Sequence, residues 1–376
     1  MEPEEPGKEG VLVLEDGSVY RGQGFGAETE VSGEVVFNTS MVGYPELLTD
    51  PSYQEQIVAM AYPILGSYGV PSLTIRDNWG VPLHFESDSM KVKGFVVHSL
   101  SEPSHWSNHE PLDEWLKEQK VPGILGIDTR ALTQKLRTKG TMLGMLKVGD
   151  APLNKRSLTK RIAELQDPNK MNLVERVSVK EPIFYQGRRQ STIVIIDCGV
   201  KFGIVRSLLT RGSTVVRVPH NFPVDKILEL NPSGIVISNG PGDPQVNKAT
   251  VALTKDLMET GLPLMGICLG AQIIGLAAGA ETYKLKFGHR AVNHPCMDLK
   301  TNRCFITTQN HGYSIDQESL KETDFQASFI NINDKTVEGI KHKNKPFLGI
   351  QWHPESSPGP YDTGFLFDRF LDVAKT

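Results

Sequence analysis

The chain has 376 residues, 39% of them apolar, and its 40 basic and 44 acidic side chains leave a formal net charge of −4. This length allows two hydrophobic cores, and the near balance of charge excludes a strongly basic protein built to bind nucleic acid or anionic membranes. No apolar run approaches the roughly 20 residues that span a bilayer, and the acidic first ten residues do not resemble a signal peptide. We therefore expect a cytoplasmic protein that has neither a nucleic acid nor a membrane as partner.

Residues 1–150 are predicted to form a β-rich α+β domain. Short apolar runs alternate there with turns rich in Gly and Pro, a pattern typical of many short strands. Two helices are expected, at 112–119 and at 130–139. Asp128 or Thr129 is the candidate cap of the second helix.

The remainder of the chain divides into a linker and a second domain. Residues 151–190 turn polar and lose clear strand signals, which predicts a linker. Over 191–376, β-branched runs alternate with helical stretches, the pattern of an α/β fold with a doubly wound, mostly parallel sheet. The expected strands are 193–196, 214–218, 234–237 and 262–267.

Cys268 is the most informative residue of the second domain. It follows an apolar run that predicts a buried strand, and a helix-like run begins at Ala271. Gly266 and Gly270 remove Cβ atoms that would crowd a sharp strand-to-helix turn. The N-terminus of the helix favours a thiolate over a thiol. A cysteine in an apolar segment is more often an inert core residue, so further residues must decide between the two interpretations.

The first supporting segment is the His353–Pro354–Glu355 triplet. Pro354 disfavours helix for the residue before it, so the triplet is expected to be extended. Residues two apart in extended chain point to the same side, which allows Glu355 to orient the imidazole of His353. An imidazole held in this way can take a proton from a thiol and return one to a leaving group. Taken alone, the triplet is also compatible with an ordinary surface turn.

The second supporting segment is the turn at 238–244, which directly follows an expected strand. Gly240 and Gly242 leave backbone N–H groups open to a ligand. In a parallel sheet, such loops gather at the carboxyl ends of the strands, beside the Cys268 turn. Their N–H groups could hold the oxyanion of a tetrahedral intermediate. By itself this segment would be an ordinary loop.

The segments 238–244, 266–272 and 351–355 together resemble the three signature blocks of the class I (triad) glutamine amidotransferases, in the same order along the chain. The resemblance implies that Cys268, His353 and Glu355 hydrolyse the side-chain amide of glutamine to glutamate and ammonia. The N-terminal segments narrow the match, because they are similar to the small, glutamine-hydrolysing subunit of carbamoyl phosphate synthetase. The clearest of them are 14–17, 33–44, 48–53, 62–66 and 126–130.

The same resemblance implies a set of glutamine-binding residues. They are Ser52, Gly240, Gly242, Leu269, Gln272, Asn310, Gly312 and Tyr313, with Gly240 and the N–H of Leu269 as the oxyanion donors. Ala271 stands where the family commonly has histidine, Tyr313 where it often has phenylalanine and Ala291 where glycine is common. None of these three positions is expected to supply the chemistry. Asp50-Pro-Ser-Tyr is also a good turn sequence, so Ser52 has a structural alternative.

A partner enzyme is also implied by the resemblance. Free ammonia near neutral pH is mostly ammonium, which is not a nucleophile, so efficient transfer needs a protected route. The implied partner is a large synthetase subunit that makes carbamoyl phosphate from ATP and bicarbonate, for pyrimidine and arginine biosynthesis, in a heterodimer. This chain has no G-x-x-x-x-G-K-[ST] loop, so ATP is expected to bind elsewhere in that complex. The N-terminal domain is the candidate docking domain.

No metal or other cofactor is expected in this chain. Its four cysteines form no C-x-x-C pair. His289 and His294 have no carboxylate or thiolate at ligand spacing, so the segment 287–295 is interpreted as a loop. Three other functions remain open: a regulatory module that kept the fold without the chemistry, the glutaminase of another triad amidotransferase, and a cysteine peptidase.

Overall fold

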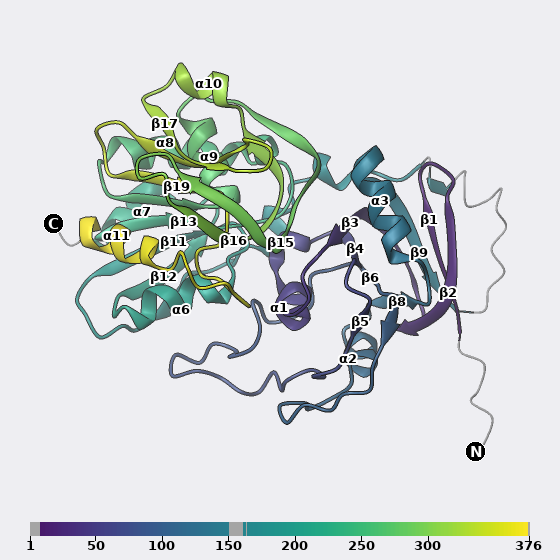
Figure 1. The fold of residues 1–376 in the computed structure, drawn as a ribbon. Coiled ribbons are helices and arrows are strands. Elements are labelled where there is room, and N and C mark those ends of the chain that lie inside the picture. Colours follow the sequence, from purple (N-terminus) through teal and green to yellow (C-terminus); the bar gives the residue numbers. More distant parts are fainter. Residues whose placement is uncertain (1–7, 150–160, 163, 375–376) are drawn as a thin grey trace. The chain divides into compact units, whose positions relative to one another are not determined.

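The computed structural model describes residues 8–149, 161–162 and 164–374. These residues form two compact units (Figure 1). The first unit comprises Met1–Asp77 and Pro82–Pro168, and the second comprises Asn78–Val81 and Asn169–Thr376. Within the linker predicted at 151–190, residues 151–160 and 163 lie outside the described part.

A closed barrel forms the first unit. Around the barrel the strands follow the order β1 (Glu9–Leu14), β2 (Val19–Gly26), β8 (Pro122–Leu125), β6 (Gly94–Val96), β4 (Gln56–Met60), β3 (Glu30–Asn38) and β9 (Met142–Val148). A separate two-stranded sheet pairs β5 (Ile64–Leu65) with β7 (Ser99–Leu100). The β-rich N-terminal part expected from the sequence is therefore confirmed, and its closure removes exposed strand edges.

The helices of the first unit are short. They are α1 (Tyr44–Thr49), the 3₁₀ turn η1 (Pro51–Tyr53), α2 (Leu112–Glu118) and α3 (Thr129–Lys139). Both helices expected from the sequence are confirmed to within one residue at each end. Asp128 caps α3, because its Oδ1 accepts a hydrogen bond from the N–H of Ala131 at 2.8 Å. Tyr44 of α1 and Trp115 of α2 are both fully buried in the same apolar core.

A ten-stranded sheet forms the centre of the second unit. Its order is β10 (Ile183–Tyr185), β12 (Thr214–Pro219), β11 (Thr192–Asp197), β13 (Gly234–Ile237), β14 (Leu264–Ile267), β19 (Phe347–Ile350), β18 (Val337–His342), β17 (Phe325–Asn331), β15 (Thr282–Asp298) and β16 (Cys304–Ile315). Neighbouring strands from β12 to β19 are parallel. The pairs at both ends of the sheet are antiparallel. The mostly parallel sheet expected from the sequence is therefore limited to five consecutive strands.

Helices cover both faces of the parallel strands (Figure 1). One face packs against α6 (Phe202–Thr210) and α11 (Phe365–Ala374), and the other against α7 (Val224–Glu229), α8 (Lys248–Glu259) and α9 (Leu269–Ala277). In β11, Ile193 and Ile195 point into the first core while Val194 and Ile196 point into the second. This period-two alternation explains why the strand is apolar throughout. The remaining short elements are η2 (Pro168–Lys170), α5 (Val174–Val177), η3 (Pro244–Val246) and α10 (Gln317–Lys321).

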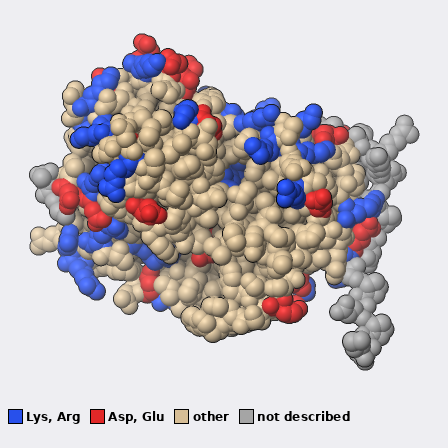
Figure 2. Space-filling model, viewed as in Figure 1, with Lys and Arg blue, Asp and Glu red and all other residues tan. Residues whose placement is uncertain are grey.

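The described helices are all too short or too polar to cross a membrane. Basic and acidic side chains lie in small separate groups on the face drawn in Figure 2. This distribution agrees with the near balance of charge along the sequence.

Candidate active site

Cys268 lies at the junction between strand β14 and helix α9, and its backbone is strained. Its φ of 55° and ψ of −108° are a conformation that residues with a Cβ rarely adopt. The turn is closed by a hydrogen bond of 2.7 Å from its N–H to the carbonyl of Ile350. A Cβ on Gly266 would lie 2.4 Å from the carbonyl oxygen of Gly270, and a Cβ on Gly270 would lie 2.0 Å from that of Ile237. Only glycine fits at these two positions, so the sharp turn depends on them.

His353 and Glu355 form a buried pair directly after strand β19. The Nδ1 atom of His353 lies 2.7 Å from Oε1 of Glu355, and both side chains are almost completely buried. Burial by itself would lower the pKa of His353, but the Glu355 carboxylate and the contact with the Cys268 thiol raise it to about 10. Burial also works against ionised Glu355, yet Lys201 and His353 lower its pKa to about 2. The pair therefore favours an imidazolium beside a carboxylate.

Lys201 is a member of this site that the sequence analysis missed. Its Nζ lies 3.1 Å from Oε1 of Glu355, and only 3% of its side chain is exposed. Its backbone N–H donates to Oδ1 of Asn239 at 3.0 Å, which fixes the start of helix α6. The available signal was its place in the sequence, between Val200 and Phe202 just beyond a buried strand. A lysine in an apolar context at such a strand end is a candidate for a buried ion pair.

The loop after strand β13 packs so closely against the backbone of Cys198 that Gly240 has no room for a side chain. A Cβ on Gly240 would lie 2.1 Å from the carbonyl oxygen of Cys198. Gly242 has a φ of +85°, which favours glycine. Leu269 is the first residue of helix α9, where a helix has no internal acceptor for the backbone N–H. Gly240 and Leu269 thus offer main-chain donors at the ends of neighbouring parallel strands.

Strand β16 contributes the backbone that lies against helix α9. The Cys268 Sγ donates to the carbonyl oxygen of Asn310 at 3.6 Å. The Nε2 atom of Gln272 donates to the carbonyl of Tyr313 at 2.8 Å and to Oε1 of Gln351 at 3.1 Å. Gly312 lies between these contacts, and a Cβ there would be 3.2 Å from Nη2 of Arg290. The structure thus joins these β16 residues to the Cys268 turn through direct contacts.

Ser52 belongs to the first unit, not to the second. It lies in η1, where its N–H donates to Oδ1 of Asp50 at 2.9 Å. Only 8% of its surface is exposed. The turn role that the sequence offered as an alternative for Ser52 is therefore present.

Comparisons with known proteins match both units. The family model described as "Carbamoyl-phosphate synthase small chain, CPSase domain" matches residues 12–146, and "Glutamine amidotransferase class-I" matches residues 194–373. The chain is 48% identical over 368 residues to the carbamoyl phosphate synthase small chain of Pyrococcus furiosus, covering 97% of this chain and 98% of that one. Its identity to the small chain of Aquifex aeolicus is 47% over 382 residues, covering 98% and 99%. The chain belongs to the carbamoyl phosphate synthase small chain family.

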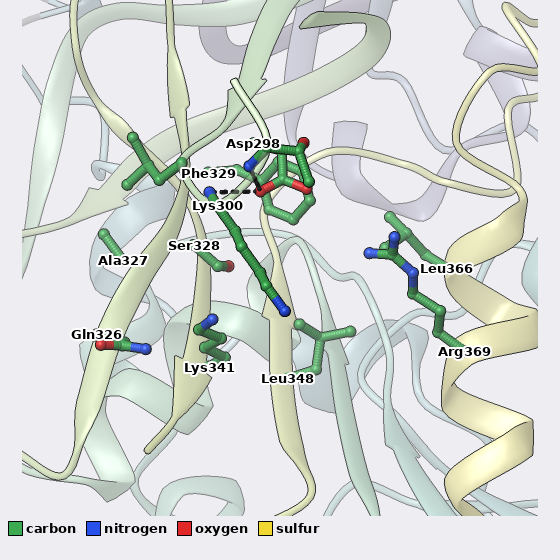
Figure 3. Close-up of a pocket in the computed structure, with 12 residues that line it drawn as sticks. Asp298, Lys300, Gln326, Ala327, Ser328, Phe329, Lys341, Leu348, Leu366 and Arg369 are labelled. Atoms are coloured by element: carbon green, nitrogen blue, oxygen red, sulfur yellow. Dashed lines mark hydrogen bonds between the residues drawn. The ribbon is translucent and has the colours of Figure 1, made fainter. Parts of the chain in front are cut away.

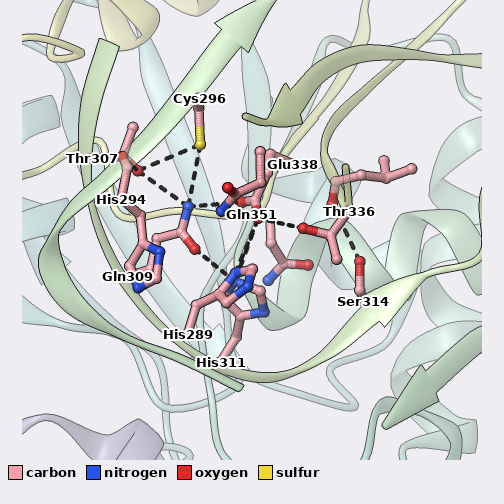
Figure 4. A network of polar contacts seen from close by, with 12 residues as sticks. His289, His294, Cys296, Thr307, Gln309, His311, Ser314, Thr336, Glu338 and Gln351 are labelled. Carbon is pink, nitrogen blue, oxygen red and sulfur yellow. Dashed lines mark hydrogen bonds and ion pairs between the residues drawn. The ribbon is translucent and has the colours of Figure 1, made fainter. Parts of the chain in front are cut away.

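The second unit also contains a mostly buried cluster, the histidine–carboxylate network, of which Figure 4 labels His289, Gln309, His311 and Glu338. We define it as His289, Gln309, His311, Asp334 and Glu338. His289 lies between two carboxylates, with Nε2 2.8 Å from Asp334 and Nδ1 3.2 Å from Glu338. Gln309 donates to Glu338 at 2.9 Å, and His311 contacts Oε1 of Gln309 at 3.1 Å. Because His311 also contacts the carbonyl of Tyr313 at 2.8 Å, the network reaches the residues beside Gln272.

Two expectations from the sequence about this region were wrong. The segment 287–295 is not a loop but part of strand β15, whose pairing with β16 has irregularities on both sides of His289. Polar residues interrupt any apolar alternation there, which hid the strand. His289 also has carboxylate neighbours after all, because antiparallel pairing and the adjacent turn bring Glu338 and Asp334 to it from about 45 to 50 positions away.

A metal could in principle use part of this network. Donor atoms of His289, His311 and Glu338 lie within 4.8 Å of one another. All three residues nevertheless have protein partners, since Glu338 also accepts from Thr336 at 3.1 Å. Burial alone would lower the pKa of His289, but its two carboxylate partners raise it to about 9. A protonated imidazole between two carboxylates accounts for the geometry of His289.

Proposed function

We propose that this chain is the glutaminase subunit of carbamoyl phosphate synthetase and that it hydrolyses glutamine through a thioester on Cys268. The observation that carries the proposal is the buried Cys268–His353–Glu355 arrangement. In it a strained cysteine stands at a helix N-terminus, its thiol contributes to the raised pKa of His353, and a carboxylate holds that imidazole at 2.7 Å. Nucleophile, base and orienting group in this order are what acyl transfer requires.

In the first half of the reaction, the thiol proton already rests on His353, whose raised pKa favours the imidazolium, and the thiolate sulfur attacks the amide carbon of glutamine. The carbonyl oxygen becomes an oxyanion, which the N–H groups of Leu269 and Gly240 stabilise. His353 then gives its proton to the amide nitrogen, the carbon–nitrogen bond breaks and ammonia leaves. A γ-glutamyl thioester on Cys268 remains.

In the second half, water enters and His353 removes one of its protons as the oxygen attacks the thioester carbon. The carbon–sulfur bond breaks, glutamate leaves and the thiol is restored. Lys201 and Glu355 keep the imidazole in one orientation through both halves, because their ion pair is buried. No metal or other cofactor is required by any of these steps.

The α-amino and α-carboxylate groups of glutamine are assigned to residues around the Cys268 turn. Gln272 has both of its donor contacts committed to Tyr313 and Gln351, which leaves its Oε1 to accept from the substrate ammonium. The carbonyl groups of Asn310 and Tyr313 contact the turn, and Gly242, Gly312 and Ser52 are the remaining members of the proposed set. This assignment follows the family match and the contacts given above.

Ammonia is proposed to pass to a large synthetase subunit that uses ATP and bicarbonate to make carbamoyl phosphate, in a cytoplasmic heterodimer serving pyrimidine and arginine biosynthesis. The family name of the relatives, a small chain, supports a large partner. The N-terminal barrel is the proposed docking domain. It contributes none of the proposed triad.

The decisive experiment follows glutamate release from glutamine with and without the large subunit, ATP and bicarbonate. We expect a low basal rate that the complete mixture raises. Acid quenching with radiolabelled glutamine should trap label on the protein, and hydroxylamine should release it, as it does from a thioester. Absence of both turnover and trapped label, with the complex still forming, would identify the chain as a regulatory module instead.

A further inference from the structure

A cavity of about 590 Å³ lies in the second unit, remote in sequence from the Cys268 turn (Figure 3). It is bounded by strands β17, β18 and β19, by the turn that follows β15 and by helix α11. None of the proposed catalytic or glutamine-binding residues lines it. The lining residues are Asp298, Leu299, Lys300, Thr301, Gln326, Ala327, Ser328, Phe329, Lys341, Leu348, Leu366 and Arg369.

Three cations from three different elements converge on this cavity. Lys300 comes from the turn after β15, Lys341 from β18 and Arg369 from α11, and Figure 3 shows the side chain of Lys300 extending across the space toward Leu348. None of the three forms an ion pair with a residue in the described part of the chain. The guanidinium of Arg369 lies over the ring of Phe365 at 4.6 Å, a contact that leaves its N–H groups available.

The one carboxylate in the lining can offset only one of these three positive charges. Asp298 is 7% exposed, and its Oδ1 accepts the backbone N–H groups of Lys300 at 2.8 Å and Thr301 at 3.3 Å. The carboxylate also fixes the turn that carries Lys300. The cavity retains an excess of positive charge.

A buried hydroxyl lies just behind the wall of the cavity. Ser328 is 8% exposed, and its Oγ has no hydrogen-bond partner among the described residues. Its oxygen has almost no accessible surface, so a ligand reaches this unsatisfied hydroxyl only once the Ser328 side chain has turned toward the cavity. Figure 3 places this hydroxyl between Lys300 and Lys341.

We propose that this cavity binds the phosphate group of a small phosphorylated molecule, at a site separate from the glutaminase centre. A phosphate group carries a charge of about −1.5 to −2 and three acceptor oxygens, which suits several cations and a hydroxyl better than a single carboxylate would. Arg369 supplies a planar fork for two phosphate oxygens, and the two lysines supply point charges. The space exceeds one phosphate group, so the ligand is a diphosphate or a phosphate ester.

The cavity also has a physical connection to the proposed catalytic histidine. Phe329 lines it, and its ring meets the ring of Trp352 edge-on with centroids 4.9 Å apart. Trp352 is buried and directly precedes His353. This connection rests on the proposed function. It predicts that a bound phosphate changes the glutaminase rate by about twofold or more.

Calorimetric titration of the full chain with inorganic pyrophosphate and, separately, with glycerol 3-phosphate at low ionic strength tests the site. We expect saturable binding with one site per chain, weakened by salt. The probe that binds more tightly distinguishes a free polyphosphate from a phosphate ester. The double variant Lys300→Gln/Lys341→Gln should weaken binding at least about tenfold, and Ser328→Ala about threefold.

The matched control is Lys226→Gln, which removes one positive charge from an exposed helix of the same unit. It should leave binding unchanged. Equal weakening by this control, or no saturable binding of either probe, would overturn the site, because the attraction would then be diffuse. A glutaminase rate that stays unchanged under saturating probe would overturn the connection to His353, whereas the titration judges the site itself and does not depend on turnover.

Discussion

The parallel and antiparallel halves of the ten-stranded sheet use polar residues in different ways. In the parallel half, the side chains proposed to be catalytic follow the strand ends, as Cys268 follows β14 and His353 follows β19. In the antiparallel half, His289, His311 and Glu338 lie within strands and meet their partners across the sheet. Strand ends leave side chains and N–H groups free for a substrate, while cross-strand pairs hold the backbone. We infer that the first half performs the chemistry and the second supports it.

The largest expected effect comes from comparing serine substitutions of two cysteines, one in each half of the sheet. Cys268→Ser should lower glutamine hydrolysis by about three orders of magnitude or more, because a serine hydroxyl in this site ionises far less readily than a thiol. Cys304→Ser is the matched control, since Cys304 is exposed on the antiparallel strand β16. Its turnover should equal that of the unchanged protein. Hydrolysis retained by Cys268→Ser would contradict the division between the two halves.

A substitution of Lys201 tests whether catalysis in the parallel half also depends on this buried positive charge. Lys201→Met should lower kcat roughly 10²-fold, because Glu355 loses the ammonium that holds it and the imidazole is misplaced. Lys201 lowers the pKa of Glu355, so its removal should also shift the acid limb of the kcat/KM profile to higher pH. Lys226→Met, at an exposed lysine, should change neither quantity. An unshifted acid limb would limit Lys201 to a role in stability.

Lys201 also shows which part of the site could not be predicted from the sequence. The positions of Cys268 and Gly240 relative to their strands could be anticipated, because each lies in a short motif whose geometry is set by neighbours in the chain. The triplet at His353 was expected to be extended, but residues 353–356 form a turn in which the N–H of Ser356 donates to the carbonyl of His353 at 3.1 Å. Lys201 carries no such motif. Its partner Glu355 lies more than 150 positions away, and only the order of the strands brings the two together.

The fold, like the site, could be predicted from the sequence only where the signals are local. Apolar runs located four of the five parallel strands, all except β19, and the helices α2 and α3, since alternation and capping are local signals. The hairpin of β15 and β16 was missed because its buried face is polar, with His289 and His311 satisfied by Asp334, Glu338 and other cross-strand partners. A polar core of this kind follows from pairing, and pairing is not visible along one segment.

The pH dependence of stability tests the supporting half. The pKa of His289 is raised from its ordinary 6.5 to about 9, so the protonated ring stabilises the folded state fully below pH 6.5 and ceases to do so as the pH rises through 9. The stability difference between the unchanged protein and His289→Gln should therefore shrink by roughly 2 to 3 kcal/mol over that window. Urea unfolding followed by hydrogen exchange of β15 and β16 peptides measures this unit alone. A difference independent of pH would show that His289 is not charged.

The smallest expected effect concerns how the histidine–carboxylate network in the antiparallel half influences glutamine binding at the Cys268 turn. His289→Gln should raise the KM for glutamine about fivefold and leave kcat within about twofold, a loss near 1 kcal/mol. The reason is that Glu338, once His289 is gone, holds Gln309 and the following residues of β16 less firmly, while the triad itself is untouched. His342→Gln is the matched control, because this histidine lies on the same sheet outside the network. A fall in kcat with unchanged KM would place His289 in the chemistry and erase the distinction between the two halves.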